Sequence, residues 1–112
     1  MLVSWKSGNK AVYVSRTIYL GTEYDDIKIY LDTKLVGDTT YKVFYSLDAN
    51  GEDWVEMNTE SVTPLSEFWQ QNYYHTSLAE MHDTFRVRVE INCTDPSKKP
   101  KISRLMCIMR DL

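Results

Sequence analysis

The chain is poor in the residues that mark several specialised protein classes. It has only 4 glycines and 3 prolines among 112 residues, which excludes collagen-like and low-complexity architectures. It also has only 2 histidines, and a zinc or catalytic site needs several convergent groups. What remains is an ordinary globular composition with 43% hydrophobic residues and many tyrosines. We expect one domain over residues 1–112, with 1–9 as a flexible or linker-like start.

The sequence has no large excess of either positive or negative charge. The net charge is −3, and no run of like charges is longer than Lys98-Lys99, so the sequence lacks the basic track that a phosphate backbone attracts. No apolar stretch approaches the roughly 18 residues of a membrane span, and no export signal is visible. We therefore expect a soluble protein that binds no nucleic acid, does not insert into membranes and is assembled in a reducing cytosol.

Alternation of apolar and polar residues is the clearest positive signal. It runs through Ile27–Leu31, Tyr41–Leu47 and Phe85–Ile91, and a period of two is typical of half-buried strands. Further strands are predicted over Lys10–Leu20 and Trp54–Met57, with a turn at Gly21–Asp26. The sequence thus predicts an all-β fold, an antiparallel β-sandwich that is jelly-roll-like and has at most one short helix.

The alternation fails between Asn58 and His82, which we interpret mainly as a long loop. Within it, Thr63–Trp69 has the residues that cap and start a short helix, and Tyr73–Leu78 is a candidate short strand. A connection this long is either functional or an error of assignment.

The last two strands, Thr84–Asn92 and Ile102–Met109, are predicted to form a hairpin around Asp95–Pro100. In that register Cys93 and Cys107 lie roughly 15 Å apart or more, at about 3.3 Å per residue. A disulfide needs Cα atoms within about 7 Å, so we expect free thiols.

Several segments together resemble the small β-sandwich modules of bacteriophage tail, baseplate and tail-fibre proteins, which are similar to galactose-binding-like (discoidin-like) jelly rolls. The sharpest pieces are Tyr45-Ser46-Leu47-Asp48 with Gly51 and Trp54, Phe85-Arg86-Val87-Arg88-Val89, and Pro100-Lys101-Ile102-Ser103-Arg104-Leu105. The resemblance implies a non-enzymatic virion protein, assembled in the host cytoplasm, that serves assembly or host attachment. It implies neighbouring or identical virion subunits as partners, in a homo-oligomer, and no enzymatic activity.

The long loop carries a first candidate site. The loop is rich in aromatic and amide side chains. Aromatic rings stack against the apolar faces of sugars, and amide side chains form hydrogen bonds with sugar hydroxyl groups. The loop therefore indicates a host-surface glycan as an alternative partner. Closure of the sandwich core by the same aromatics is the competing interpretation. The candidate ligand-binding residues are Trp69, Gln71, Tyr73, Tyr74 and His75.

The final strand carries a second candidate site, because it is apolar on both faces. Such a strand is covered twice within a domain or buried against a partner, and methionine and arginine are enriched at interfaces. The candidate interface residues are Ile102, Arg104, Met106, Ile108 and Arg110.

The acidic residues elsewhere in the sequence indicate turns rather than metal-binding or catalytic sites. Asp48, Asn50 and Asp53 have the alternate spacing of a calcium loop, but the twelfth position counted from Asp48 is Thr59 instead of a bidentate glutamate. Asn50-Gly51 suits a hairpin turn, which we favour over a metal site. Asp25-Asp26 is likewise assigned to a turn, and both histidines to exposed loops. We expect no cofactor.

Overall fold

The computed structural model describes residues 4–6, 10–34, 38–48, 52–94 and 100–111. These residues form strands and connections, and no helix occurs among them. The strands are β1 (Ser4–Lys6), β2 (Lys10–Val14), β3 (Ile18–Lys34), β4 (Thr40–Ser46), β5 (Val55–Met57), β6 (Thr59–Pro64), β7 (Trp69–Asn92) and β8 (Ile102–Arg110).

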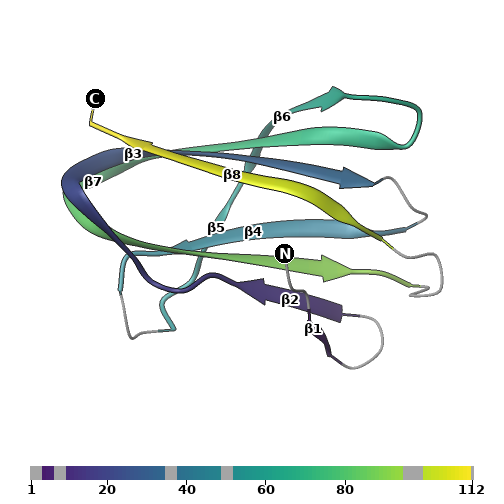
Figure 1. The fold of residues 1–112 in the computed structure, drawn as a ribbon, viewed down its shortest axis with the longest axis horizontal. Helices are drawn as coiled ribbons and strands as arrows, with labels where there is room; N and C mark the ends of the chain where they lie inside the picture. Colours follow the sequence, from purple (N-terminus) through teal and green to yellow (C-terminus); the bar gives the residue numbers. More distant parts are fainter. Residues whose placement is uncertain (1–3, 7–9, 35–37, 49–51, 95–99, 112) are drawn as a thin grey trace.

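Two antiparallel layers face one another (Figure 1). Sheet A has the order β1-β2-β7-β4-β5, and sheet B has the order β6-β7-β3-β8. Strand β7 belongs to both layers, since its first half pairs within sheet B and its second half within sheet A. The predicted all-β antiparallel sandwich is confirmed.

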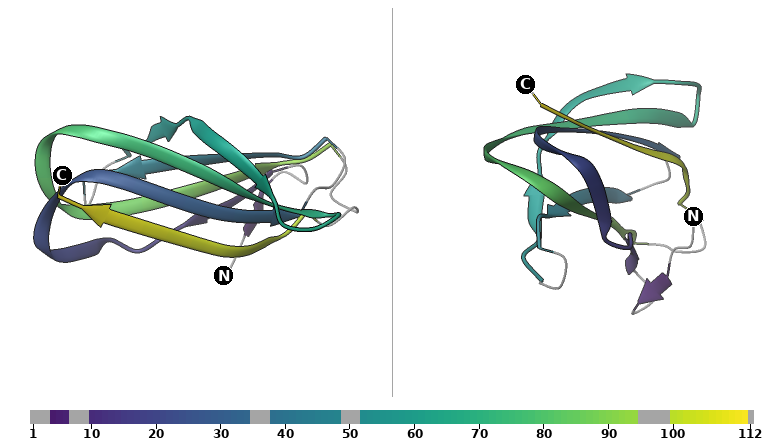
Figure 2. Two further views of the ribbon diagram at one scale, coloured as in Figure 1. Left: turned by 90° about the horizontal axis from the view of Figure 1, so that it is seen from above. Right: turned by 60° about the vertical axis from the view of Figure 1, so that its left-hand side comes forward.

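The bend of β3 corrects one sequence expectation. Gly21–Asp26 is not a turn, because β3 continues through it while it stays alongside β7. The register of this pair shifts between Tyr19 and Tyr24 and again between Tyr24 and Asp26. Such irregularities bend a strand sharply without ending it, and Figure 2 shows β3 and β7 curving together at one end of the sandwich.

The segment from Asn58 to His82 is also not a loop. It contains β6 and the first half of β7, and the predicted helix at Thr63–Trp69 is instead the turn of this hairpin. The backbone N–H groups of Leu65 and Ser66 both donate to the carbonyl oxygen of Trp69. Proline suits the end of β6 because β6 is an edge strand that pairs only with β7 in the described chain.

The predicted hairpin of the last two strands is wrong as well. Strand β8 pairs with β3 in sheet B, whereas the second half of β7 lies in sheet A between β2 and β4. Cys93 therefore follows a strand of one sheet, and Cys107 pairs with Ile29 in the other. No disulfide joins the two cysteines, as expected. Burial raises the pKa of the Cys107 thiol to about 11, which keeps it protonated and unreactive.

Apolar side chains from both sheets fill the space between the layers. The buried set is Tyr24, Ile27, Ile29, Leu31, Val43, Met57, Tyr74, Phe85, Val87 and Val89. At the bend, the rings of Tyr24 and Phe85 meet edge to face at 6.3 Å, and the Tyr24 hydroxyl donates to the Thr84 carbonyl oxygen at 2.6 Å. This contact closes the core at the bent end.

Replacement of Phe85 by alanine tests the importance of the bend. Phe85 is fully buried, so Phe85→Ala is expected to lower the free energy of unfolding by about 3–5 kcal/mol. The matched variant Phe68→Ala removes a ring that is 55% exposed and is expected to change it by less than about 0.5 kcal/mol. Urea titration followed by circular dichroism measures both. Equal losses would show that the core does not depend on this contact.

Candidate functional site

The outer face of sheet B unites the two sites that the sequence indicated separately. On β3, Ile27, Ile29 and Leu31 face the core, so the alternate residues face outward. The paired residues of β7 and β8 follow the same alternation. The outer face carries Trp69, Gln71, Tyr73 and His75 of β7 together with Arg104, Met106, Ile108 and Arg110 of β8. Strand β3 lies between them (Figure 2, left).

Two of the predicted site residues do not belong to this face. Tyr74 is 2% exposed and is part of the core, because it alternates with Tyr73 and His75 on β7. Ile102 packs against the core as well. A register shift between Asp32 and Thr33 reverses the alternation at this end of β8, which the sequence pattern of β8 alone does not reveal.

Stacked rings form the centre of the face. Tyr30 and Tyr73 stack with 4.9 Å between ring centroids and 24° between planes, and His75 follows Tyr73 at 6.3 Å and 17°. Met106 is the partner of Tyr30 on β8. Burial, and next the neighbouring Tyr30, raise the pKa of the Tyr73 hydroxyl, so it remains a neutral hydrogen-bonding group. The result is a row of rings packed against one another, next to Lys28, which is the partner of His75 on β3.

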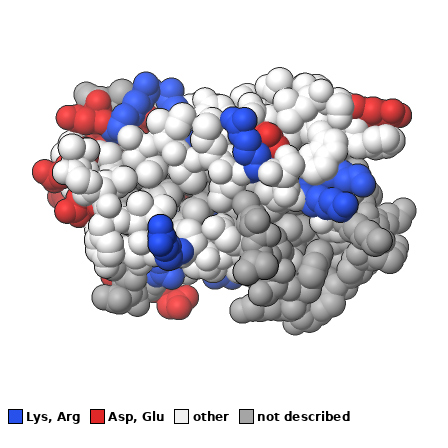
Figure 3. Space-filling view, in the orientation of Figure 1, with Lys and Arg blue, Asp and Glu red and all other residues white. Residues whose placement is uncertain are grey.

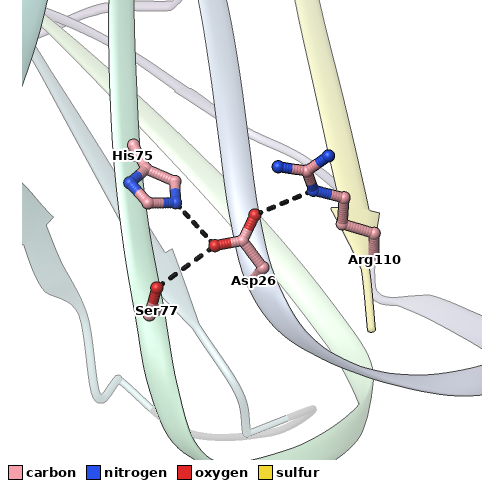
Figure 4. A network of polar contacts seen from close by, with 4 residues as sticks. All are labelled: Asp26, His75, Ser77 and Arg110. Atoms are coloured by element: carbon pink, nitrogen blue, oxygen red, sulfur yellow. Dashed lines mark hydrogen bonds and ion pairs between the residues drawn. The ribbon is translucent and has the colours of Figure 1, made fainter. Parts of the chain in front are cut away.

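A buried carboxylate closes one end of the row (Figure 4). Asp26 has no exposed side-chain surface, and its two oxygens contact groups from both neighbouring strands. One oxygen lies 2.5 Å from Nε2 of His75 and accepts from the Ser77 hydroxyl at 3.2 Å, and the other accepts from Nε of Arg110 at 3.2 Å. Asp26 was expected in a turn, and its structural role was missed.

The charge of Asp26 is stabilised by these contacts. Burial raises the pKa of the carboxyl group, but the hydrogen bonds from His75, Arg110 and Ser77 and the attraction of His75 outweigh it, so the pKa lies below its usual range. The same alternation that predicted Ile27 and Ile29 as core residues places Asp26 on the opposite face beside them. The missing information was which strands flank β3.

A second polar contact lies further along the same face. The Gln71 side-chain amide donates to a carboxylate oxygen of Asp32 at 3.0 Å. Asp32 is 8% exposed, so this bond holds both side chains flat against the sheet. The outer face is therefore ordered by its own contacts rather than formed by free side chains.

The described contacts do not assemble a nucleophile beside a base. The Ser77 hydroxyl donates to Asp26 rather than to His75, and His82 lies beside the Tyr24 ring with 6.5 Å between centroids. Both histidines thus lie on β7, half-buried, and not in exposed loops as predicted.

The candidate calcium loop lies partly outside the described residues, because Asn50 falls in the gap at 49–51. Asp48 and Asp53 border one shallow hollow together with Tyr45, Leu47, Val55 and His82. Within the described ranges, no three histidine, cysteine, aspartate or glutamate side chains gather closely enough to hold a metal ion.

Comparison with protein-family models, curated proteins and solved structures finds no match to this chain. In the described part of the chain, no helix has the length and apolarity that a membrane crossing requires. Lys, Arg, Asp and Glu are interspersed over a largely uncharged surface on the side seen in Figure 3. The described residues on that side form no continuous track of positive charge.

Replacement of Asp26 by asparagine is expected to destabilise the fold at neutral pH by about 1–3 kcal/mol, because an amide cannot accept on both sides. The folded-state pKa of Asp26 is lowered, so its stabilisation is present above the unfolded pKa of about 3.9 and is lost as pH falls through the folded value. The stability difference between wild type and Asp26→Asn should therefore shrink below about pH 4. Urea titrations at several pH values measure it, and a difference independent of pH would contradict the assigned charge.

Proposed function

We propose that this chain is a non-enzymatic structural and interaction module that docks against a neighbouring protein subunit with the outer face of sheet B. The observation that carries the proposal is that four of the five residues of each predicted set lie on this one face. Its stacked rings and the neighbouring Met106 and Arg104 have the composition of a protein interface, where aromatic residues, methionine and arginine are enriched.

The outer face of sheet A differs in a way that supports this choice. Lys10 of β2 lies 2.6 Å from the carboxylate of Glu90 on β7, and Arg88, also on β7, lies 3.7 Å from the same carboxylate. The Arg88 guanidinium also lies 5.8 Å from the centre of the Phe44 ring. The stacked rings lie on the outer face of sheet B instead, so we favour sheet B as the docking face.

The biological setting we propose is a bacteriophage tail or baseplate, with assembly in the host cytoplasm and identical or adjacent virion subunits as partners. Its support is the resemblance of the Tyr45–Trp54 and Phe85–Val89 segments and of the segment that begins at Pro100. The antiparallel sandwich agrees with that resemblance, although many unrelated functions share such a fold.

Introduction of a charge at the border of the face tests the assembly. Met106→Asp is expected to convert an oligomer of the wild type to monomers without unfolding it, because a buried unpaired carboxylate is costly. The matched control is Val14→Asp, since Val14 is 43% exposed on the outer face of sheet A and its replacement should leave the oligomer intact. Light scattering over a concentration series measures the mass. A monomeric wild type would exclude docking between identical copies and leave only an adjacent, different subunit as the partner.

A second candidate function is recognition of a host-surface glycan by the same face. The specific observation in its favour is the row of stacked rings formed by Tyr30, Tyr73 and His75, flanked by Gln71, whose side-chain amide donates to Asp32. Aromatic platforms of this kind match the apolar faces of sugar rings. Trp69, which begins β7, extends the platform toward the hairpin turn.

Retention of the protein on host polysaccharide distinguishes glycan recognition from docking between subunits. Tyr73→Ala and Trp69→Ala are each expected to weaken retention about fivefold to tenfold if the rings stack on sugars. Tyr19→Ala, which removes a ring that is 74% exposed outside the stack, should leave retention unchanged. Affinity electrophoresis in polysaccharide gels measures it. Unchanged migration of folded variants would exclude the glycan role, and unfolding of Trp69→Ala would assign Trp69 to the core.

A further inference from the structure

Strand β8 is an open edge of sheet B. It pairs with β3 on one side, and no other described strand pairs with it on the other. Edge strands in natural proteins are usually short, interrupted by proline or protected by inward-pointing charges. Among the described edges, β1 and β5 have three residues each and β6 ends in Pro64, but β8 has nine residues and no proline.

The inward side of β8 is incompletely covered. Leu105, Cys107 and Met109 point toward the core and pack against it, and all three remain only partly buried. Because β8 is the last strand of its sheet, these side chains have a neighbour on the β3 side only. A further strand along this edge would remove their remaining apolar surface from water, which is favourable.

We propose that β8 pairs antiparallel with β8 of a second copy of the chain, about a two-fold axis at Met106, so that two sheets B join into one continuous sheet. This inference rests on the proposed function, names a second copy of the chain as the partner, and places the contact along the β8 border of the face rather than across the face. Met106 is the middle residue of Ile102–Arg110. This register pairs the regular part of the strand from Arg104 to Ile108, and the extra residue at Ser103 leaves Ile102 outside it. Backbone hydrogen bonds along a free edge then supply the affinity.

The charges of β8 favour this register with a second copy. Arg104 lies opposite Ile108 of the partner subunit, so no arginine faces another. If the axis moved by one residue to Cys107, Arg104 would lie opposite Arg110 of the partner subunit, and like charges directly opposite are destabilising. With the axis at Met106, the β8 border of the face therefore meets its copy without repulsion between arginines.

The central row of the outer face also continues across the axis. In one copy the row runs Tyr73, Tyr30, Met106, and the two-fold axis places Met106 against Met106 of the partner subunit. In the dimer, the rings of one copy are thus followed by its Met106, then by Met106 of the partner subunit, and then by the rings of the second copy. Thioethers pack favourably beside aromatic rings and adapt to one another, which makes an identical chain a suitable neighbour.

Opposite charges at Ile108 test the register. Ile108→Lys would place two lysines opposite two arginines across the axis, so the dissociation constant of the dimer is expected to rise about tenfold. Ile108→Glu, the matched control at the same site, would face those arginines with opposite charge and is expected to stay within about threefold of wild type. Lys28 is the neighbour of Ile108 within the chain, so thermal melts of both variants verify that the monomer remains folded.

Sedimentation equilibrium measures the dissociation constants, and amide hydrogen exchange of the wild type reports on the edge itself. Pairing is expected to protect alternate β8 amides that do not bond to β3, whereas docking through the face would leave them unprotected. Equal weakening by both variants, no effect of either, or unprotected amides in a wild-type dimer would overturn the edge pairing alone. A monomeric wild type would exclude the edge pairing together with every other docking between identical copies.

Discussion

The pairing of β3 with β7 is the constraint on which the rest of the structure depends. These strands run side by side through both layers, from Ile18 beside Phe85 to Lys34 beside Trp69. Because each bends from one sheet into the other, the pair fixes the distance between the layers and forms the closed end of the core. Contacts so distant in sequence require large loop closures before they stabilise anything, so the bend must form as a unit.

The polar network around Asp26 lies where this constraint is most demanding. Asp26 is the first residue of β3 after the last register shift near the bend, and its pairing with Ser77 and Arg110 restores the regular ladder on both sides. A buried carboxylate that accepts from β7 and β8 at once is satisfied in one register only. Displacement by one residue would turn it into the core without these donors, at a large desolvation cost.

The sequence predicted the fold class and most of the core, because strict alternation in Ile27–Leu31 and Phe85–Ile91 depends only on a half-buried strand. It failed where both faces of a strand carry polar groups or rings. In residues 69–78 the buried Asn72 and Tyr74 alternate with Tyr73 and His75 on the outer face. The two sets differ in burial but not in polarity, so the sequence shows no apolar–polar alternation there. Strand neighbours were equally inaccessible, since β8 follows β7 in the chain but pairs with β3, and local pattern does not encode that choice.

The same limit explains why the candidate site was found in two halves. Each half was identified by its own composition, the aromatic residues of β7 and the two-faced pattern of β8, but the residues that join them belong to β3. Tyr30 and Asp32 supply that link through the stack with Tyr73 and the bond with Gln71. A face ordered in this way needs little rearrangement to bind, which lowers the entropic cost of association. In the described chain no strand covers its border along β8, so the strand pairing that builds the fold is also the contact by which we propose that copies join.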